Sequence, residues 1–294
     1  MFKNLLKKLI IVCLLFTTNN LHATQPVFED VTILVSSCDK YAPLWDPFFV
    51  SLFKQWPSLM QDNRELPIML IANNKFFSNP RVKTLNIPNE ISWSDNMITA
   101  LNQVNTKYVL VVLDDYWINS PVDEQRLHEI YSTMQQEDAA MLHVSVNDPR
   151  WQPGVKHAIV PNLLYTNKFK HYKATLQLAI WNTEALKFLL RPGESPWDFE
   201  LAGTARSHGY PKPFLSLSGN EPITYMNAVQ QGYIHMNAML YTQQQQITFD
   251  PGTLQVLGKN RFKVSYQLWK NKVSKVLKLL NTSAYYPYSI EQSK

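Results

Sequence analysis

Short apolar runs alternate with segments of helical periodicity through the first half of the chain. Residues 31–35 and 108–113 are rich in β-branched and other apolar side chains, which predicts two buried strands. Over 44–56, apolar residues recur every three or four positions, which predicts an amphipathic helix that ends at Pro57. Two shorter runs predict further strands: 68–71 and 82–87.

Helix signals lie between and after these strands. Ser92 precedes a segment with one apolar face, and Asp95 stands three residues later, which predicts a capped helix start. A polar helix is expected over 123–136, followed by a strand near 141–146. This alternation predicts an α/β fold, with an open, mostly parallel sheet flanked by helices.

The second half of the chain is less regular. A strand is predicted over 174–180 and a helix over 183–190. Another helix is expected to begin within 194–200 and to reach Ser207. Over 264–280, apolar positions share one helical face and lysines occupy much of the rest, which predicts a basic C-terminal helix.

The first 23 residues predict a signal peptide or a short membrane tether. Three lysines precede the apolar run 9–16, and Ala23 supplies a small residue before the expected cut. The run is short for a bilayer span, which favours a cleaved signal, and an uncleaved tether is the alternative. We therefore expect an exported protein, periplasmic or secreted, or else one tethered to the membrane.

Charge and cysteine content define the rest of the chain. The content of 45% hydrophobic and 17% charged residues excludes a disordered chain. Cys38 is the only cysteine after the leader, so we expect no internal disulfide.

We expect one domain over 24–250 and a basic helical extension over 251–294. That extension suits an anionic membrane surface, contacted through 259–280, or else it packs on the domain with a solvated basic face. Because the rest of the mature chain is mildly acidic and lacks a nucleic-acid motif, we expect no nucleic-acid binding.

Two acids follow the strongest predicted strand. Asp114 and Asp115 come directly after the apolar run, where parallel strands present ligand sites. Mutual repulsion and burial oppose their ionisation, and a divalent cation would relieve both. Oxygen ligands suit Mn²⁺ or Mg²⁺. The alternative is that one carboxylate caps a turn and the other is solvated.

A second acidic cluster comprises Glu194, Asp198 and Glu200. A carboxylate here could take a proton from a hydroxyl within hydrogen-bond reach. The alternative is ordinary helix N-terminal chemistry, because Ser195 precedes a helix that has acids in its first turn.

Four stretches together resemble bacterial glycosyltransferases of the GT-A type that act in surface-polysaccharide biosynthesis. These stretches are 35–41, 93–95, 113–117 and 194–200. The resemblance covers roughly 30–240, and Leu-Asp-Asp-Tyr and Glu-Ser-Pro-Trp-Asp-Phe-Glu are its most specific pieces. It implies a GT-A-like fold, related to the Rossmann fold.

The resemblance also implies roles for particular acids. Asp114 and Asp115 match the motif that holds Mn²⁺ or Mg²⁺ and the donor diphosphate, although the pattern here is Asp-Asp-Tyr and not Asp-x-Asp. Asp198 matches the catalytic base of inverting members, and Glu200 is the second choice.

Three further residues are assigned to the donor by the same resemblance. Ser37 and Asp39, after the first strand, would contact the nucleotide base or ribose. Asp95 would face the donor, and its capping role is the alternative.

The implied function is metal-dependent, inverting transfer of a sugar from a nucleotide-sugar donor to a saccharide or lipid-linked acceptor, as in a hexosyltransferase. Sugar nucleotides are cytosolic in bacteria, whereas the leader directs the chain out of the cytosol. One alternative is a non-catalytic carbohydrate-binding or surface-assembly protein on the same scaffold. Another is a glycoside hydrolase that uses Asp115 and Asp198.

Overall fold

The computed structural model describes residues 28, 30–61, 66–145, 154–230 and 232–256. The leader expected at 1–23 and the basic helix expected at 264–280 lie outside the described residues. Within the described part of the chain, no helix has both the length and the apolar character needed to cross a membrane.

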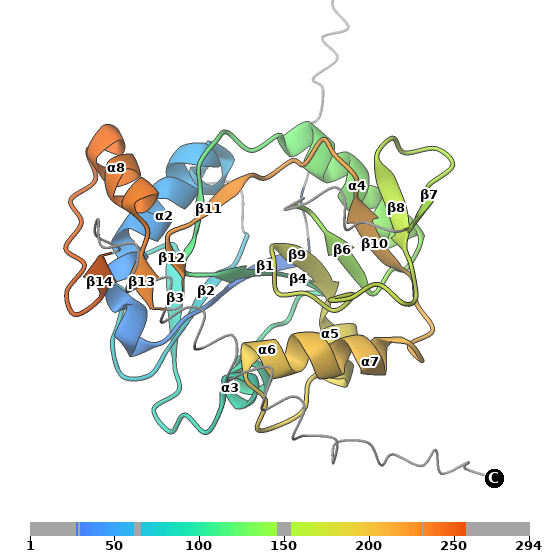
Figure 1. The fold of residues 1–294 in the computed structure, drawn as a ribbon, viewed down its shortest axis with the longest axis horizontal. Helices are drawn as coiled ribbons and strands as arrows, with labels where there is room; N and C mark the ends of the chain where they lie inside the picture. Colours follow the sequence, from blue (N-terminus) through green and yellow to red (C-terminus); the bar gives the residue numbers. More distant parts are fainter. Residues whose placement is uncertain (1–27, 29, 62–65, 146–153, 231, 257–294) are drawn as a thin grey trace, which may run out of the picture.

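The described residues form a central sheet in the order β3-β2-β1-β4-β9-β6-β10-β8-β7 (Figure 1). Strands β9 and β8 run opposite to the other members, which share one direction. This arrangement confirms the predicted α/β class with an open, mostly parallel sheet. The strand bounds are β1 Val31–Ser36, β2 Ile68–Ala72, β3 Val82–Asn86, β4 Tyr108–Leu113, β6 Met141–His143, β7 Gly154–Lys156, β8 Leu163–Thr166, β9 Ala179–Asn182 and β10 Phe214–Leu217.

Helices cover both faces of this sheet. Apolar side chains of α2 and α4 pack on one face, and those of α3, α5 and the π-helical turn η4 pack on the other (Figure 1). The helix bounds are α2 Trp45–Gln55, α3 Trp93–Leu101, α4 Glu124–Gln136, α5 Thr183–Leu189, α6 Pro196–Asp198, η4 Phe199–Gly203, α7 Thr204–Ser207 and α8 Met236–Gln245. Two 3-10 turns flank α2, η1 Asp39–Leu44 and η2 Pro57–Met60.

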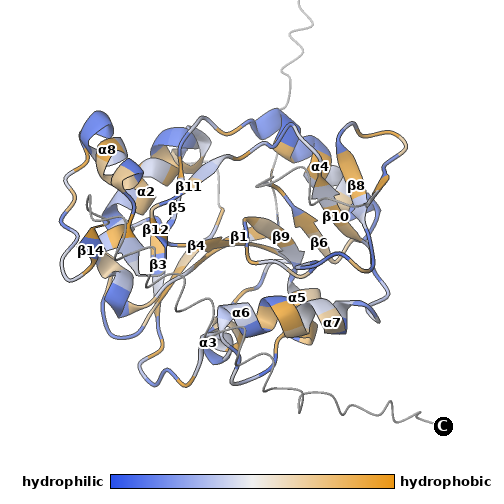
Figure 2. Cartoon of the chain, in the orientation of Figure 1, coloured by the Kyte–Doolittle hydropathy of each residue, from blue (hydrophilic) through white to orange (hydrophobic). Residues whose placement is uncertain are grey.

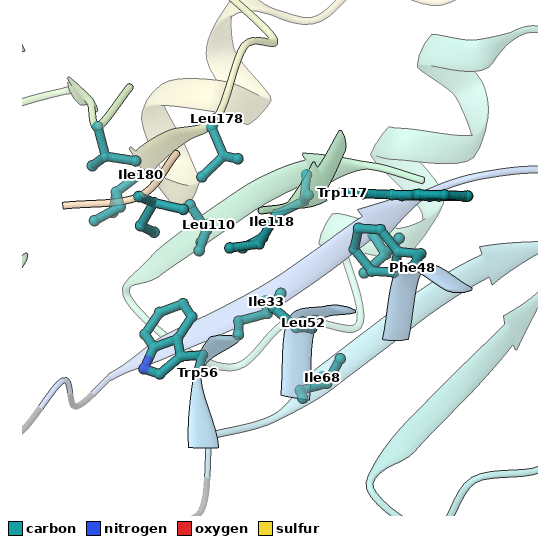
Figure 3. Close-up of a cluster of buried hydrophobic side chains, with 14 of the residues drawn as sticks. Ile33, Phe48, Leu52, Trp56, Ile68, Leu110, Trp117, Ile118, Leu178 and Ile180 are labelled. Atoms are coloured by element: carbon teal, nitrogen blue, oxygen red, sulfur yellow. The ribbon is translucent and has the colours of Figure 1, made fainter. Parts of the chain in front are cut away.

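Strand alternation divides the core into two layers. In β1, Ile33 and Val35 join the layer under α2, whereas Leu34 joins the layer under α3. The neighbouring β4 alternates in the same way, and Leu110 lies in the α2 layer with Ile33 (Figure 3). Both faces of these central strands are therefore apolar. Figure 2 colours β1 largely as hydrophobic. The continuous apolar runs in the sequence follow from this burial.

Smaller sheets complete the described fold. β5 (Tyr116–Ile118) pairs antiparallel with β11 (Tyr225–Asn227). β12 (Val229–Gln230), β13 (Tyr233–Ile234) and β14 (Gln255–Val256) form a three-stranded sheet. Leu254, just before β14, is buried in the α2 layer. The described fold therefore continues past residue 250.

The second half differs from the predicted elements in two places. The strand expected over 174–180 begins at Ala179, because the preceding residues bond to side chains of η4 and α7. The helix expected within 194–207 is interrupted by the π-helical turn η4, which separates α6 from α7. Such turns are frequent at functional sites.

Candidate active site

The strand order reverses between β1 and β4. From β1, the chain proceeds through β2 and β3 on one side, whereas β4 lies on the other. In open α/β sheets, ligands bind beyond the carboxyl ends of the strands at such a switch point. The residues after β1 are 37–39, and Asp114 and Asp115 follow β4. The predicted loop and acid pair therefore meet at the expected edge.

Asp114 is held toward the α2 face of the sheet. Its side chain is 6% exposed, and the Ser37 hydroxyl donates to Asp114 Oδ2. The Trp45 indole Nε1–H of α2 donates in turn to Ser37 Oγ at 2.7 Å. Burial and the charge of Asp115 raise the pKa of Asp114 well above its ordinary value. Ser37 thus positions an acid rather than standing free at the edge.

The preceding residue is held from the opposite face. Ser36 Oγ accepts a hydrogen bond of 2.9 Å from the Trp93 indole Nε1–H of α3. Consecutive strand residues point to opposite faces, so Ser36 and Ser37 each meet an indole from a different helix layer. These two bonds fix the end of β1 beside the acids.

Asp115 carries the least satisfied carboxylate of the edge. Its Oδ1 is buried, and no described residue makes a hydrogen bond to it. Burial raises the pKa of Asp115 to about 7. The backbone carbonyl is fixed by the Ala228 N–H at 2.7 Å, which ties the acid to the chain after β11. A buried carboxylate oxygen without a partner requires an explanation, and a bound cation is one that suits its chemistry.

Tyr116 connects the acid pair to the second acidic cluster. Its ring stacks on Tyr225, with centroids 4.3 Å apart. Burial raises the pKa of Tyr116, and Tyr225 raises it further. Asp115 and Glu200 add to the same shift, so both carboxylates lie near the Tyr116 hydroxyl. The structure therefore brings Glu200 to the same edge as Asp115.

Glu200 lies in the π-helical turn η4 and is half-buried. Its Oε1 accepts from Thr175 Oγ1 at 3.1 Å and from the Leu176 N–H at 2.9 Å. These residues precede the reversed strand β9, so they lie at the edge where β1 and β4 end. Burial raises the pKa of the Glu200 carboxyl. This side chain is an acid held in place with an increased affinity for a proton.

Asp198 is exposed and caps the short helix α6. Its Oδ2 accepts from the Ser195 N–H at 3.1 Å and from Ser195 Oγ at 2.6 Å, while Ser195 Oγ accepts from the Asp198 N–H. This is a reciprocal capping box. Glu194 pairs with Arg206 through two bonds of 2.8 Å. Both acids therefore have local structural partners.

Asp39 connects the loop after β1 to the loop after β2. Its carboxylate accepts from the backbone N–H groups of Asn73, Asn74 and Lys75 at 2.9–3.2 Å. Although partial burial opposes the change, these donors lower the pKa of Asp39.

Asp95 also has local partners. Its Oδ2 accepts from Ser92 Oγ at 2.5 Å and from the Gly193 N–H at 2.9 Å. Ser92 Oγ accepts from the Asp95 N–H, as the predicted cap requires. The Ser92 bond, and after it the Gly193 bond, lower the pKa of Asp95. These contacts thus join α3 to the loop before α6.

A divalent cation fits the acid pair only with help from a ligand. No cluster of three or more His, Cys, Asp or Glu side chains able to hold a metal occurs among the described residues. The buried Oδ1 of Asp115 is an oxygen donor of the kind that Mg²⁺ and Mn²⁺ prefer. Mg²⁺ commonly binds through one or two carboxylates together with phosphate oxygens and water.

Sequence reasoning missed the supports of these acids. Trp45 was seen only as part of an apolar helix face, whereas its indole N–H holds Ser37. Thr175 and Leu176, which hold Glu200, fall in the run 174–180 that was predicted to be a strand, and that pattern gives no sign of a bond to Glu200. The Tyr116–Tyr225 stack joins residues that are distant in the sequence and are brought together by the pairing of β5 with β11.

Comparisons with known proteins give only distant similarity. No protein-family model matches the sequence, and no curated protein matches it. The chain is similar to a solved structure of S. aureus TarS 1-349 at 15% identity and a TM-score of 0.44, over 66% of this chain and 59% of that chain. It is similar to the mannosyltransferase PcManGT from Pyrobaculum calidifontis, in complex with GDP-Man and Mn2+, at 13% identity and a TM-score of 0.45, over 69% and 58%. A CMP:2-keto-3-deoxy-manno-octonic acid synthetase complexed with CTP is similar at 10% identity and a TM-score of 0.40, over 64% and 88%.

The aligned part spans less than two thirds of the first two structures. With TM-scores below 0.5, these similarities establish neither a family nor an activity for the chain.

Proposed function

We propose that the chain is a glycosyltransferase that moves a sugar from a nucleotide-sugar donor to a saccharide or lipid-linked acceptor, with inversion. The observation that carries this proposal is the buried Asp115 Oδ1, which lacks a partner among the described residues and lies at the strand-order switch point. An oxygen donor at that position suits a cation shared with the diphosphate of a donor.

Asp114 and Asp115 would hold Mn²⁺ or Mg²⁺ together with that diphosphate. The Ser37 and Trp45 bonds fix Asp114, while Asp115 keeps an oxygen available. When bound, the cation would stabilise the negative charge that grows on the departing diphosphate. Ser37, Asp39 and Asp95 would shape the donor side through the loops that they hold in place.

The catalytic base that the contacts favour is Glu200. A general base works best when its pKa approaches the working pH, and burial raises the pKa of Glu200 in that direction. Glu200 also acts electrostatically on Tyr116, the residue next to Asp115. Asp198, the first choice from the sequence, becomes the second candidate here, since its carboxylate already serves the capping box with Ser195. Glu200 would take the proton of an acceptor hydroxyl while that oxygen attacks the anomeric carbon.

We further propose that residues 1–23 direct the chain out of the cytosol and that 259–280 contact an anionic membrane surface. Both segments lie outside the described residues, and the sequence pattern supports the two proposals. Sequencing the N-terminus of protein from fractionated cells tests the leader. Co-sedimentation with vesicles containing anionic lipid, compared with a variant in which the basic residues of 259–280 are replaced by glutamine, tests the membrane contact. Export is refuted by a cytosolic chain that keeps its leader, and membrane contact is refuted by equal binding of the two forms.

The decisive experiment measures thermal stabilisation by a panel of nucleoside diphosphates, with and without Mn²⁺. We expect one nucleotide to raise the melting temperature only when Mn²⁺ is present, and Asp115→Asn to abolish this rise. Asp138→Asn is the matched control, because the exposed Asp138 pairs with Lys212 before β6, at the opposite edge of the sheet, and its substitution should leave the metal-dependent rise in place. Absence of a shift with every nucleotide contradicts the transferase proposal and favours the carbohydrate-binding alternative.

A further inference from the structure

A buried histidine stands outside the donor site described above. His143 is 3% exposed at the end of β6, and neither ring nitrogen has a hydrogen-bond partner among the described residues. A neutral imidazole carries one donor and one acceptor, and leaving such groups buried without partners destabilises the folded state. An orphaned ring of this kind requires an explanation.

The position of His143 relates it to the acid pair. β6 runs in the same direction as β4, so His143 lies at the same carboxyl edge. Ala179 of β9 pairs with Val111 on one side and with His143 on the other. His143 is therefore two strand spacings from β4, or roughly 10 Å.

The base candidate lies between these two strands in the order of the sheet. The residues that bind Glu200, Thr175 and Leu176, lead directly into β9. Because β9 separates β4 from β6, the edge carries three groups in sequence: the acid pair, the Glu200 segment and His143.

A cation accompanies the buried ring. Burial, and after it the charge of Lys170, lower the pKa of His143 to about 3. Lys170 is half-buried, and burial lowers its own pKa to about 8, so it remains largely protonated at neutral pH. An anion beside the ring would accept a hydrogen bond from it, and the positive charge of Lys170 would attract that anion.

We propose that His143 and Lys170 form a subsite for an oxyanion, a carboxylate or phosphate group carried by the acceptor. That the anionic group belongs to an acceptor rests on the proposed transferase function, whereas the oxyanion subsite itself rests on the burial and placement of His143. The distance of roughly 10 Å from β4 separates this subsite from a diphosphate held at Asp115. The Glu200 segment between them would then meet an acceptor hydroxyl while the anionic group is held at His143.

The test uses nitrogen-detected NMR of the histidine rings in the full chain. The probes are inorganic phosphate and glucuronate, with glucose as the uncharged control. We expect either or both anions to shift the His143 ring resonances and to raise its midpoint of titration by two pH units or more, and glucose to have no effect. The anion that binds more tightly identifies the oxyanion. Lys170→Met should weaken this binding at least tenfold, whereas Lys168→Met, at an exposed neighbouring lysine, should leave it within twofold.

Two outcomes would overturn the subsite. At high anion concentration all histidine resonances will shift together through non-specific effects. If neither anion shifts the His143 ring resonances below that concentration, the ring is a buried core residue. If only a nucleoside diphosphate with Mn²⁺ perturbs it, the group belongs to the donor side. The transferase proposal fails by a different result. If no nucleotide with Mn²⁺ raises the melting temperature but anions still bind at His143, the transferase is refuted and the subsite stands.

Discussion

Asp115→Asn should make the cation-free protein more stable at pH 8 than the wild type. The pKa of Asp115 is about 7 in the folded chain against an ordinary value of 3.8, because burial disfavours its charge. The folded state therefore binds more protons than the unfolded state between these values, so the free energy of unfolding decreases as pH rises from about 4 to about 7. The difference between the two pKa values corresponds to about 4 kcal/mol once the group is ionised.

The substitution removes this penalty but leaves a buried amide. An unsatisfied polar group costs about 1–3 kcal/mol, so we expect a net gain of about 1–3 kcal/mol at pH 8. Near pH 4 the native carboxyl is protonated and carries no charge penalty, so only the cost of the buried amide remains, and the variant should unfold at a lower urea concentration than the wild type. The measurement is urea unfolding at pH 4.5 and pH 8 with EDTA present, followed by circular dichroism.

Ligands should reverse the ranking. With Mn²⁺ and the nucleotide found in the panel at about one hundred times its Kd, the wild type should gain about 2.7 kcal/mol and the variant nothing. Asp39→Asn should show the opposite pH dependence. The backbone donors lower the pKa of Asp39, so the ionised carboxylate stabilises the wild-type fold at high pH and this stabilisation is lost as pH falls. If Asp115→Asn is less stable than the wild type at pH 8, or if their difference is the same at both pH values, the buried-charge reasoning is refuted.

Three further predictions concern the acids and their supports. Glu200→Gln should lower turnover by about 10²–10⁴-fold with donor affinity within twofold, measured by nucleotide release; a collapse of donor affinity would contradict a role as base. Asp198→Asn should lower stability by about 1 kcal/mol in urea unfolding and change turnover less than threefold, and a larger loss of turnover would return it to the role of base. Trp45→Phe removes the donor to Ser37, so the position of Asp114 should become less fixed. The Mn²⁺-dependent nucleotide affinity should then fall about threefold to tenfold in calorimetry. Unchanged affinity would show that the indole bond is dispensable.

The strands at the centre of the fold were predictable because burial on both faces demands apolar residues throughout. β4 (Tyr108–Leu113) matches its predicted bounds, and β1 extends its predicted run by one residue, Ser36. The Ser92 cap was also readable, since its spacing to Asp95 is local. In contrast, β9 reverses direction inside the sheet, and the short apolar run around it carries no mark of that direction.

The candidate site was predictable as a set of residues but not as a set of partnerships. Asp114 and Asp115 stand out because polar residues directly after an apolar strand are conspicuous. The choice between Asp198 and Glu200 depends on which carboxylate the helix start uses for capping, and only the folded structure shows this. His143 was hidden because a single histidine at the end of a strand has no spacing that distinguishes it.

The insertion of β9 between β4 and β6 also bears on the order in which the chain is made. One edge of β4 pairs with β1, which is synthesised earlier, while the other edge stays unpaired until residues 179–182 are synthesised. Until that segment emerges, the apolar strand offers an open row of backbone groups to any other nascent chain. This topology therefore requires that the unpaired edge of β4 be protected from aggregation during synthesis, however stable the finished domain is.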